Sequence, residues 1–290
     1  MASMKEIKRR RSSIQSTKQI TKAMKLVSTV KLQKARQKAE KSKPYFMLIY
    51  DTIASILTRS TNLEHRYLRK NEGGKAAVIT ITSNRGLAGG YNNNIIRLTE
   101  HSFKKDEVLI YSIGKKGKDA LERHGYSIAG DYAEVMNEPL YTDAAEITSV
   151  LLKEYEKGGI SAIYLAYTNF KNTVVHLPTL IKLLPLSADE MKQSPEEENG
   201  TAKSEALMNY SPNEEVVLDA IVPKYVSSII FGALKQAAAA ENGARMNAME
   251  NATNNADELI EKLSLQYNRA RQGAITQELT EIVAGANAIE

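Results

Sequence analysis

The chain has 290 residues, of which 42% are hydrophobic and 25% charged, and this is enough apolar content for one large or two modest domains. It contains no cysteine, which excludes disulfides, thiolate metal sites and cysteine nucleophiles. None of its four histidines is spaced from another as metal ligands are, and no apolar run approaches the roughly 18 residues of a membrane span, so we expect neither a metal enzyme nor a transmembrane protein.

The net charge of +5 is concentrated at the start of the chain. Residues 1–44 hold about fourteen Lys and Arg side chains and only two acidic residues, Glu6 and Glu40. Such a segment is a solvated helix face, a nucleic-acid contact or the contact for an acidic protein partner. The nucleic-acid interpretation lacks support from interleaved aromatic residues or a base-reading motif.

Residues 1–58 are predicted to form one long helix of up to about 80 Å. The segment contains no glycine and is rich in Lys, Gln, Ala and Leu, which favour helices. Pro44 predicts a bend rather than an end, because the helical pattern resumes after it. We expect the buried face to consist of its regularly spaced apolar residues, namely Ile7, Ile14, Ile20, Met24, Val27 and Val30.

Residues 75–186 are predicted to form an α/β domain with a mostly parallel sheet. Strands are expected at 76–82, 107–113, 126–130 and 160–167, and helices at about 91–104, 115–124 and 142–157. Residues 174–186 follow the last of these strands after a short loop, so we predict an antiparallel edge strand there.

The glycine-rich segment 83–91 follows a strand and precedes a helix, which is where phosphate-binding loops lie. It matches neither common phosphate-loop pattern, so we predict a tight turn that needs positive φ angles. A nucleotide-binding enzyme that uses Gly86 to Gly90 remains an alternative. Five carboxylates follow further on, spread over a loop and a helix start where acidic residues are common anyway, and they are Asp131, Glu134, Glu138, Asp143 and Glu146.

A polar, acidic stretch at 187–209 is predicted to be a flexible loop. The last segment, 210–290, is predicted to be one helix. Ser211, Pro212 and Glu214 fit a capping box at its start, and Pro223 is expected to kink it.

The last helix carries a long apolar stripe with alternating spacings of three and four, the pattern of a coiled coil. Its members are Met246, Met249, Thr253, Ala256, Ile260, Leu263, Tyr267, Ala270 and Ala274, and a displaced continuation holds Leu279, Ile282, Ala286 and Ile289. Such a stripe needs a partner helix, and the first segment offers one. The predicted fold class is therefore α/β, with a long antiparallel coiled coil of the N- and C-terminal helices and an inserted Rossmann-like α/β domain. The last helix outlasts its partner, so we expect another protein to bury its tip.

Four segments give the chain a close resemblance to the gamma subunits of bacterial F-type ATP synthases. They are ITKAMKLVSTVKLQKA (20–35), SNRGLAGGYN (83–92), ARMNAMENATNNADELI (244–260) and YNRARQGAITQELTEIVAGANA (267–288). The family often has Asp and Cys where this chain has Asn84 and Ala88, in a loop that the family uses structurally.

The resemblance implies a rotor shaft with no active site and no cofactor of its own, which couples transmembrane ion flow to ATP synthesis or hydrolysis and regulates ATPase activity. The implied partners are three alpha and three beta subunits, the epsilon subunit and the membrane ring of c subunits, at the cytoplasmic side of the cell membrane. Positions matching Arg271 and Gln272 would contact a beta subunit, and those matching Thr276 and Glu278 would couple to the region around Met24.

Overall fold

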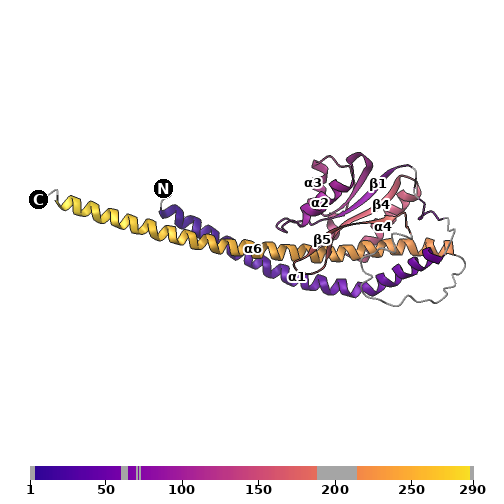
Figure 1. Ribbon diagram of the computed structural model, residues 1–290, viewed down its shortest axis with the longest axis horizontal. Coiled ribbons are helices and arrows are strands. Elements are labelled where there is room, and N and C mark those ends of the chain that lie inside the picture. The colour runs from indigo at the N-terminus through magenta and orange to yellow at the C-terminus, as the bar shows by residue number, and fades with distance from the viewer. Residues whose placement is uncertain (1–3, 60–64, 70, 72, 188–213, 288–290) are drawn as a thin grey trace. The chain divides into compact units, whose positions relative to one another are not determined.

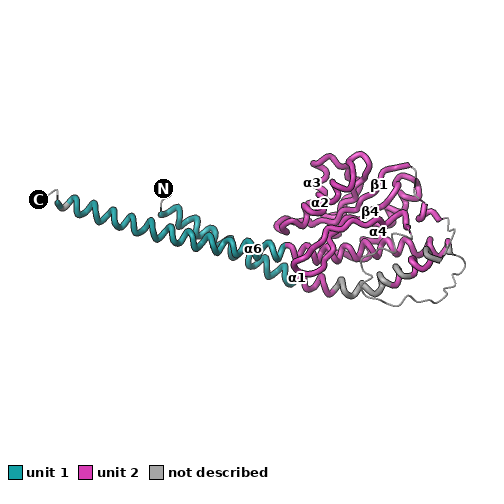
Figure 2. The backbone as a smooth tube through the Cα atoms, in the orientation of Figure 1, with its two compact units in different colours: residues 1–30, 245–290 teal, residues 31–244 magenta. Residues whose placement is uncertain are grey.

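The computed structural model describes residues 4–59, 65–69, 71, 73–187 and 214–287. The chain divides into two compact units, which are coloured separately in Figure 2. One unit combines residues 1–30 with residues 245–290, and the other consists of residues 31–244. Two helices extend through both ranges: α1 (Met4–Arg59) and α6 (Glu214–Asn287). Most of the predicted acidic loop at 187–209, and the predicted cap at Ser211 and Pro212, lie outside the described residues.

The first unit is an antiparallel pair made by the start of α1 and the end of α6 (Figure 1). The direction follows from the contacts between the two helices, because the partner on α6 moves backward as the position on α1 advances. Lys18 forms an ion pair with Asp257, and the Lys25 Nζ lies 2.7 Å from the Glu250 Oε1. This arrangement confirms the predicted coiled coil of the two chain ends.

The seam predicted on α6 is buried or half-buried through Ala270. Met249, Ala256 and Leu263 have only 4%, 5% and 8% of their surface exposed. Ala274, the last member predicted before the displaced continuation, is exposed.

The seam predicted on α1 is wrong at three positions, because Ile20, Val27 and Val30 are 60%, 57% and 54% exposed. The prediction is confirmed at Ile7, which is buried, while Ile14 and Met24 are half-buried. In the first unit, the buried polar residues Thr21 and Ser28 continue the seven-residue spacing of Ile7 and Ile14. Polar side chains fit in this seam because they find partners there: the hydroxyls of Thr21 and Thr253 lie 2.8 Å apart across it.

Neither internal proline ends its helix. The sequence predicted a bend at Pro44 and a kink at Pro223, and α1 and α6 continue through both residues. Proline has no backbone N–H, so one hydrogen bond of the helix is lost at Pro223. In the turn that follows, the Ser227 hydroxyl donates to the Pro223 carbonyl at 2.8 Å.

The second unit contains a five-stranded sheet with the strand order β3-β2-β1-β4-β5. The strands are β1 (Lys75–Ile81), β2 (Val108–Ile113), β3 (Ile128–Asp131), β4 (Ile160–Phe170) and β5 (His176–Leu184). The first four pair in parallel, and β5 pairs antiparallel with β4 at the edge of the sheet. The predicted parallel sheet and its antiparallel edge strand are both confirmed.

Helices cover both faces of this sheet, as expected for strands that are connected in parallel. The helices α2 (Tyr91–Ser102) and α3 (Lys115–Arg123) pack on one face through a cluster that includes Ile95, Ile110 and Leu121. The helix α4 (Tyr141–Glu156) and the first part of α6 share the larger cluster on the other face. Short 3-10 turns at Lys105–Glu107 and Ala133–Met136 complete the connections.

Within the described residues, one helical segment, Glu215–Gly285 of α6, is long and apolar enough to cross a membrane by length and composition, with a mean hydropathy of 1.6 in its best window. This window is 44% buried inside the chain itself. The completely buried α6 side chains Val222, Val226 and Ile230 belong to the large core cluster, so the apolar character has a role in the α/β domain.

Candidate functional site

The end of α6 carries exposed apolar side chains that the rest of the coiled coil does not cover. Every residue from 271 to 285 is exposed. Four of them are large apolar residues: Ile275, Leu279, Ile282 and Val283 are 49%, 58%, 65% and 58% exposed. An exposed apolar surface of this kind marks a site for a partner. We call residues 271–285 the tip of α6.

The tip is exposed because α1 does not reach it. The Arg11 guanidinium lies 5.7 Å from the centre of the Tyr267 ring, so the antiparallel register places Met4 opposite about residue 274. The predicted contact residues Arg271 and Gln272 lie where the pairing ends, and both are exposed.

The structure does not bring the predicted coupling residues together. Thr276 and Glu278 are exposed on the tip, where the Thr276 hydroxyl donates to the Gln272 carbonyl at 2.9 Å. Met24 is half-buried and lies next to Lys25, which pairs with Glu250. Positions 250 and 276 of a regular helix are about 39 Å apart, so any coupling between Met24 and Thr276 acts without direct contact.

A second exposed apolar face lies on α1 and was missed by the sequence reasoning, which placed these residues in the seam. It consists of Ile20, Leu26, Val27 and Val30, all more than half exposed. The signal that separates the two faces is the strict seven-residue spacing of Ile7, Ile14, Thr21 and Ser28, in which two of the four residues are polar.

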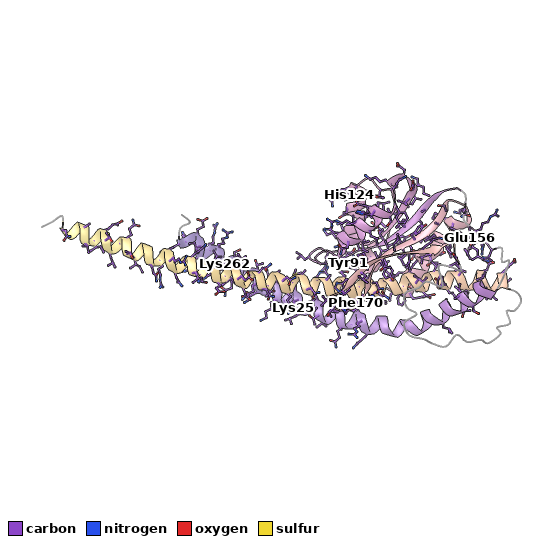
Figure 3. The ribbon with its side chains drawn as sticks, viewed as in Figure 1. Lys25, Tyr91, His124, Glu156, Phe170 and Lys262 are labelled. Carbon is purple, nitrogen blue, oxygen red and sulfur yellow. The ribbon has the colours of Figure 1, made fainter. Side chains whose placement is uncertain are left out.

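Part of the basic charge of α1 is used inside the coiled coil. Lys18 and Lys25 pair with acidic residues of α6, and Arg11 lies over an aromatic ring. Figure 3 labels Lys25 on α1. These inward cations are therefore neutralised or stacked within the chain, which leaves fewer of them for a phosphate backbone.

The glycine-rich loop is the predicted tight turn, with positive φ angles of 62° at Leu87 and 55° at Gly89. Its end is fixed to α6 through Tyr91, which Figure 3 labels and whose hydroxyl donates to the Ala237 carbonyl at 3.2 Å. Ala88, Tyr91 and Ala240 form a small buried cluster. Small α6 side chains thus allow the loop to approach closely, and the loop is a docking contact within the chain.

Side-chain amides hold the start of the same loop. The Asn92 Oδ1 accepts a hydrogen bond from the Ser83 backbone N–H at 2.9 Å. Asn84 bridges two segments, because its Nδ2 donates to the Ala133 carbonyl at 2.8 Å and its Oδ1 accepts from the Lys115 backbone N–H at 3.0 Å. The polar side chains of the loop therefore form hydrogen bonds within the chain, as expected for a tight turn.

The five candidate carboxylates are dispersed rather than convergent. Asp131 pairs with Lys118 at 2.7 Å, and this hydrogen bond lowers the pKa of the carboxyl below its usual value. The Asp143 Oδ2 accepts from the Leu140 backbone N–H at 2.9 Å and so caps α4, and Glu134 accepts from Asn137 at 2.9 Å. Among the described residues, no three His, Asp or Glu side chains are grouped as a metal site requires.

Comparison with known proteins agrees with this geometry. The family described as ATP synthase matches residues 3–289. The ATP synthase gamma chain of Lachnoclostridium phytofermentans is 58% identical over 290 residues, which cover 100% of both chains. The chain belongs to the ATP synthase gamma-chain family. Another member, the sodium ion specific gamma chain of Acetobacterium woodii, is 40% identical and is covered over 98% of its length.

Solved structures share the fold of this gamma-chain family member. A chain in the Euglena gracilis mitochondrial ATP synthase matches with a TM-score of 0.67 and 20% identity, over 99% of this chain and 94% of that one. A chain in the central stalk and c-ring structure of the Tetrahymena thermophila mitochondrial enzyme matches with a TM-score of 0.59 and 21% identity, over 80% of this chain and 99% of that one. This chain therefore has the same fold as these two ATP synthase chains.

Proposed function

We propose that the chain is the central rotor shaft of an F-type ATP synthase. In this role it couples ion flow through a membrane ring of c subunits to ATP synthesis or hydrolysis in the beta subunits, and it regulates ATPase activity. The chain contributes no catalytic residue and no cofactor. The two relatives named above support the proposal, because both are ATP synthase gamma chains that match this chain over nearly its whole length.

The observation that carries the proposal is the exposed apolar tip of α6. Leu279 and Ile282 are exposed, and leaving apolar surface in contact with water costs about 25 cal/mol per Å² in free energy compared with burying it. A sleeve of other subunits removes that cost without a bond at any particular angle. The apolar side chains of the tip need no contact at a particular angle, so they suit a part that rotates inside its partner.

The two units suit different partners. The coiled coil would be enclosed by three alpha and three beta subunits, and the α/β domain would meet the epsilon subunit and the c ring. We propose residues 1–58 and 210–290 as the shaft and residues 75–186 as its foot, with no assigned role for 187–209. The assembly would place the chain peripherally at the cytoplasmic side of the cell membrane.

Within this assembly, we assign Arg271 and Gln272 to the contact with a beta subunit. Both lie at the start of the tip, near the first residues of α1, and both side chains are exposed. Met24, Thr276 and Glu278 remain proposed coupling residues that act over a distance. The exposed α1 face that contains Ile20 and Val27 offers the same surroundings a second apolar contact.

Co-expression with the alpha, beta and epsilon subunits of the same organism tests the proposal. The expected result is a complex with one copy of this chain for three alpha and three beta subunits, and ATP-driven ion pumping once the membrane ring is added. If the chain does not assemble with these subunits, the shaft function is refuted. If it instead binds DNA with an affinity that falls steeply with salt, the nucleic-acid alternative is favoured.

A further inference from the structure

Two polar contacts connect α6 to the two ends of α4. At the first end, the Lys235 Nζ donates to the Pro139 carbonyl at 2.5 Å, just before α4 begins at Tyr141. Lys235 is only 7% exposed, and its Nζ lies 4.7 Å from the centre of the Phe231 ring. Tyr141 packs edge-on against the same ring, with 5.8 Å between the ring centres. A buried ammonium is therefore held between α6 and the start of α4.

At the other end, Arg66 bridges α6 to the last residue of α4. Its Nε and Nη2 lie 3.0 and 2.9 Å from the Asp219 Oδ1, and its Nη1 lies 3.2 Å from the Glu156 Oε1. Tyr67 donates to the same Glu156 oxygen at 2.8 Å, and the His65 Nε2 lies 3.0 Å from the Asp219 Oδ1. The guanidinium is directional, so it fixes the two carboxylates relative to each other.

The spacing of these contacts along α6 matches the length of α4. The helix α4 has 16 residues, and position 235 lies sixteen residues beyond position 219. Both intervals correspond to about 24 Å of helix. In a regular helix, side chains at this interval point roughly 160° apart around the axis. The two contacts therefore hold α6 from different sides.

Between these contacts, α4 and α6 both contribute apolar side chains to the large core cluster, such as Leu151, Ile147, Val222 and Val226. Burial of apolar surface keeps the helices together, but it is non-directional. Hydrogen bonds and ion pairs have preferred angles. The polar contacts at the two ends of α4, together with the Tyr91–Ala237 hydrogen bond, are therefore directional groups that oppose rotation of α6 against the α/β domain.

We infer that α4, fixed at both ends by Lys235 and by the Asp219–Arg66–Glu156 bridge, is an element through which the α/β domain turns α6. The inference rests on the proposed shaft function and adds the path by which torque enters the shaft. Torque about the axis of α6 tends to roll this helix on its apolar seat, and contacts on different sides at the two ends oppose that rotation. Lys235 and Asp219 are thus positioning residues of the rotor.

The test uses the whole complex with this chain, in vesicles, and measures the ions pumped per ATP hydrolysed as the opposing gradient increases. The variants are Lys235→Met, which keeps the apolar stem, Asp219→Asn, which keeps the shape, and the two combined. We expect the ratio to fall by at least about two-fold at high gradient in each single variant and further in the combined one. Matched controls are Lys224→Met and Glu215→Gln, because both side chains are exposed on the same helix, and they should keep the ratio.

If Lys235 and Asp219 only stabilised the fold, any variant that lowers the Tm equally should lower the number of ions pumped per ATP equally. Val78→Ala weakens the core on the opposite face of the sheet, so it should lower the Tm of the chain and keep the pumping ratio. If Val78→Ala lowers the ratio as much as Lys235→Met does at equal Tm, the inference is overturned. Asp219→Glu preserves the charge and should retain more coupling than Asp219→Asn. Asp219 is half-exposed, so its variants are expected to fold even if Lys235→Met does not.

The two hypotheses fail separately. If the wild-type chain supports no pumping, the proposed function fails. If the wild-type chain pumps and the combined variant pumps as many ions per ATP as the wild type at every gradient, only the role of α4 is refuted.

Discussion

Gly243 lies in the interior of α6, where a glycine would normally weaken a helix, and its replacement by alanine tests how closely α6 packs on the sheet. A Cβ at this position would lie 2.8 Å from the His176 Nε2 and 3.4 Å from the Phe170 Cε2. These two rings stack with 5.7 Å between their centres, so neither is free to move aside independently. Gly232 lies in the same helix and has no atom within 4 Å of the corresponding Cβ.

The magnitudes follow from two terms. Alanine is favoured over glycine in a helix interior by about 0.8–1.0 kcal/mol, and this gain is common to Gly243→Ala and Gly232→Ala. Overpacking of a filled site costs about 1–3 kcal/mol and applies at position 243 alone. We therefore expect Gly232→Ala to stabilise the chain and Gly243→Ala to be less stable than Gly232→Ala by about 1–3 kcal/mol.

Thermal and urea unfolding of the two variants, followed by circular dichroism, measure this difference. The additional change His176→Ala should restore stability to Gly243→Ala, because it removes the nearest ring. Equal stabilisation by both alanines would refute the close packing of the β4–β5 hairpin on α6.

Further predictions concern the tip, the coiled coil and two titrating groups. Replacing both Arg271 and Gln272 by alanine should lower ATP hydrolysis and pumping by about 2- to 30-fold while assembly of the complex, measured by gel filtration, changes less; unchanged turnover would contradict their contact role. Met24→Lys adds a like charge among lysines and should lower pumping relative to hydrolysis, whereas an unchanged ratio in vesicles would count against it. Burial lowers the pKa of His176 below the ordinary 6.5, so stability should be lost as pH falls through that value, by at most about 1.4 kcal/mol per pH unit, and His176→Gln should flatten the dependence of Tm on pH. The pKa of Asp131 is lowered from 3.8, so Asp131→Asn should reduce the Tm at pH 7 and lose its effect as the pH falls below that value; a constant effect down to strong acid would exclude the ion pair as its cause.

Regular periodicity made much of the fold predictable from the sequence. The apolar runs that became β1, β2 and β4 are buried on both faces, so they appear as continuous strands in the sequence. The α6 seam was equally visible, because Met249, Ala256 and Leu263 repeat every seven residues.

The α1 seam was not predictable from hydrophobicity alone. Thr21 and Ser28 are buried, whereas Ile20 and Val27, their immediate neighbours in sequence, are exposed. A hydrophobic side chain faces outward in this helix where a partner protein is expected, and a hydroxyl faces inward where it finds a hydrogen bond across the seam. A pattern read from one chain cannot distinguish the inner face from a face that a second protein covers.

The contacts at the ends of α4 were also outside the reach of sequence patterns. Lys235 and Asp219 resemble ordinary charged residues of a surface helix, and their partners Pro139 and Arg66 are far away in the sequence. Only the fold brings them together. Among the candidate residues on the tip, Thr276 and Glu278 came from the family resemblance alone, and the roles of all four tip residues remain predictions.

The pairing of α1 with α6 covers only part of α6, and this has a mechanical consequence for the last turns of α6. Two paired helices resist twisting through the side-chain contacts between them as well, whereas a single helix has only its own backbone hydrogen bonds to resist it. Among the described residues, α6 beyond about residue 274 has no partner helix. This end of α6 is therefore suited to keep the shaft centred in its partners. We expect the surfaces that push on the beta subunits to lie where α1 and α6 are paired.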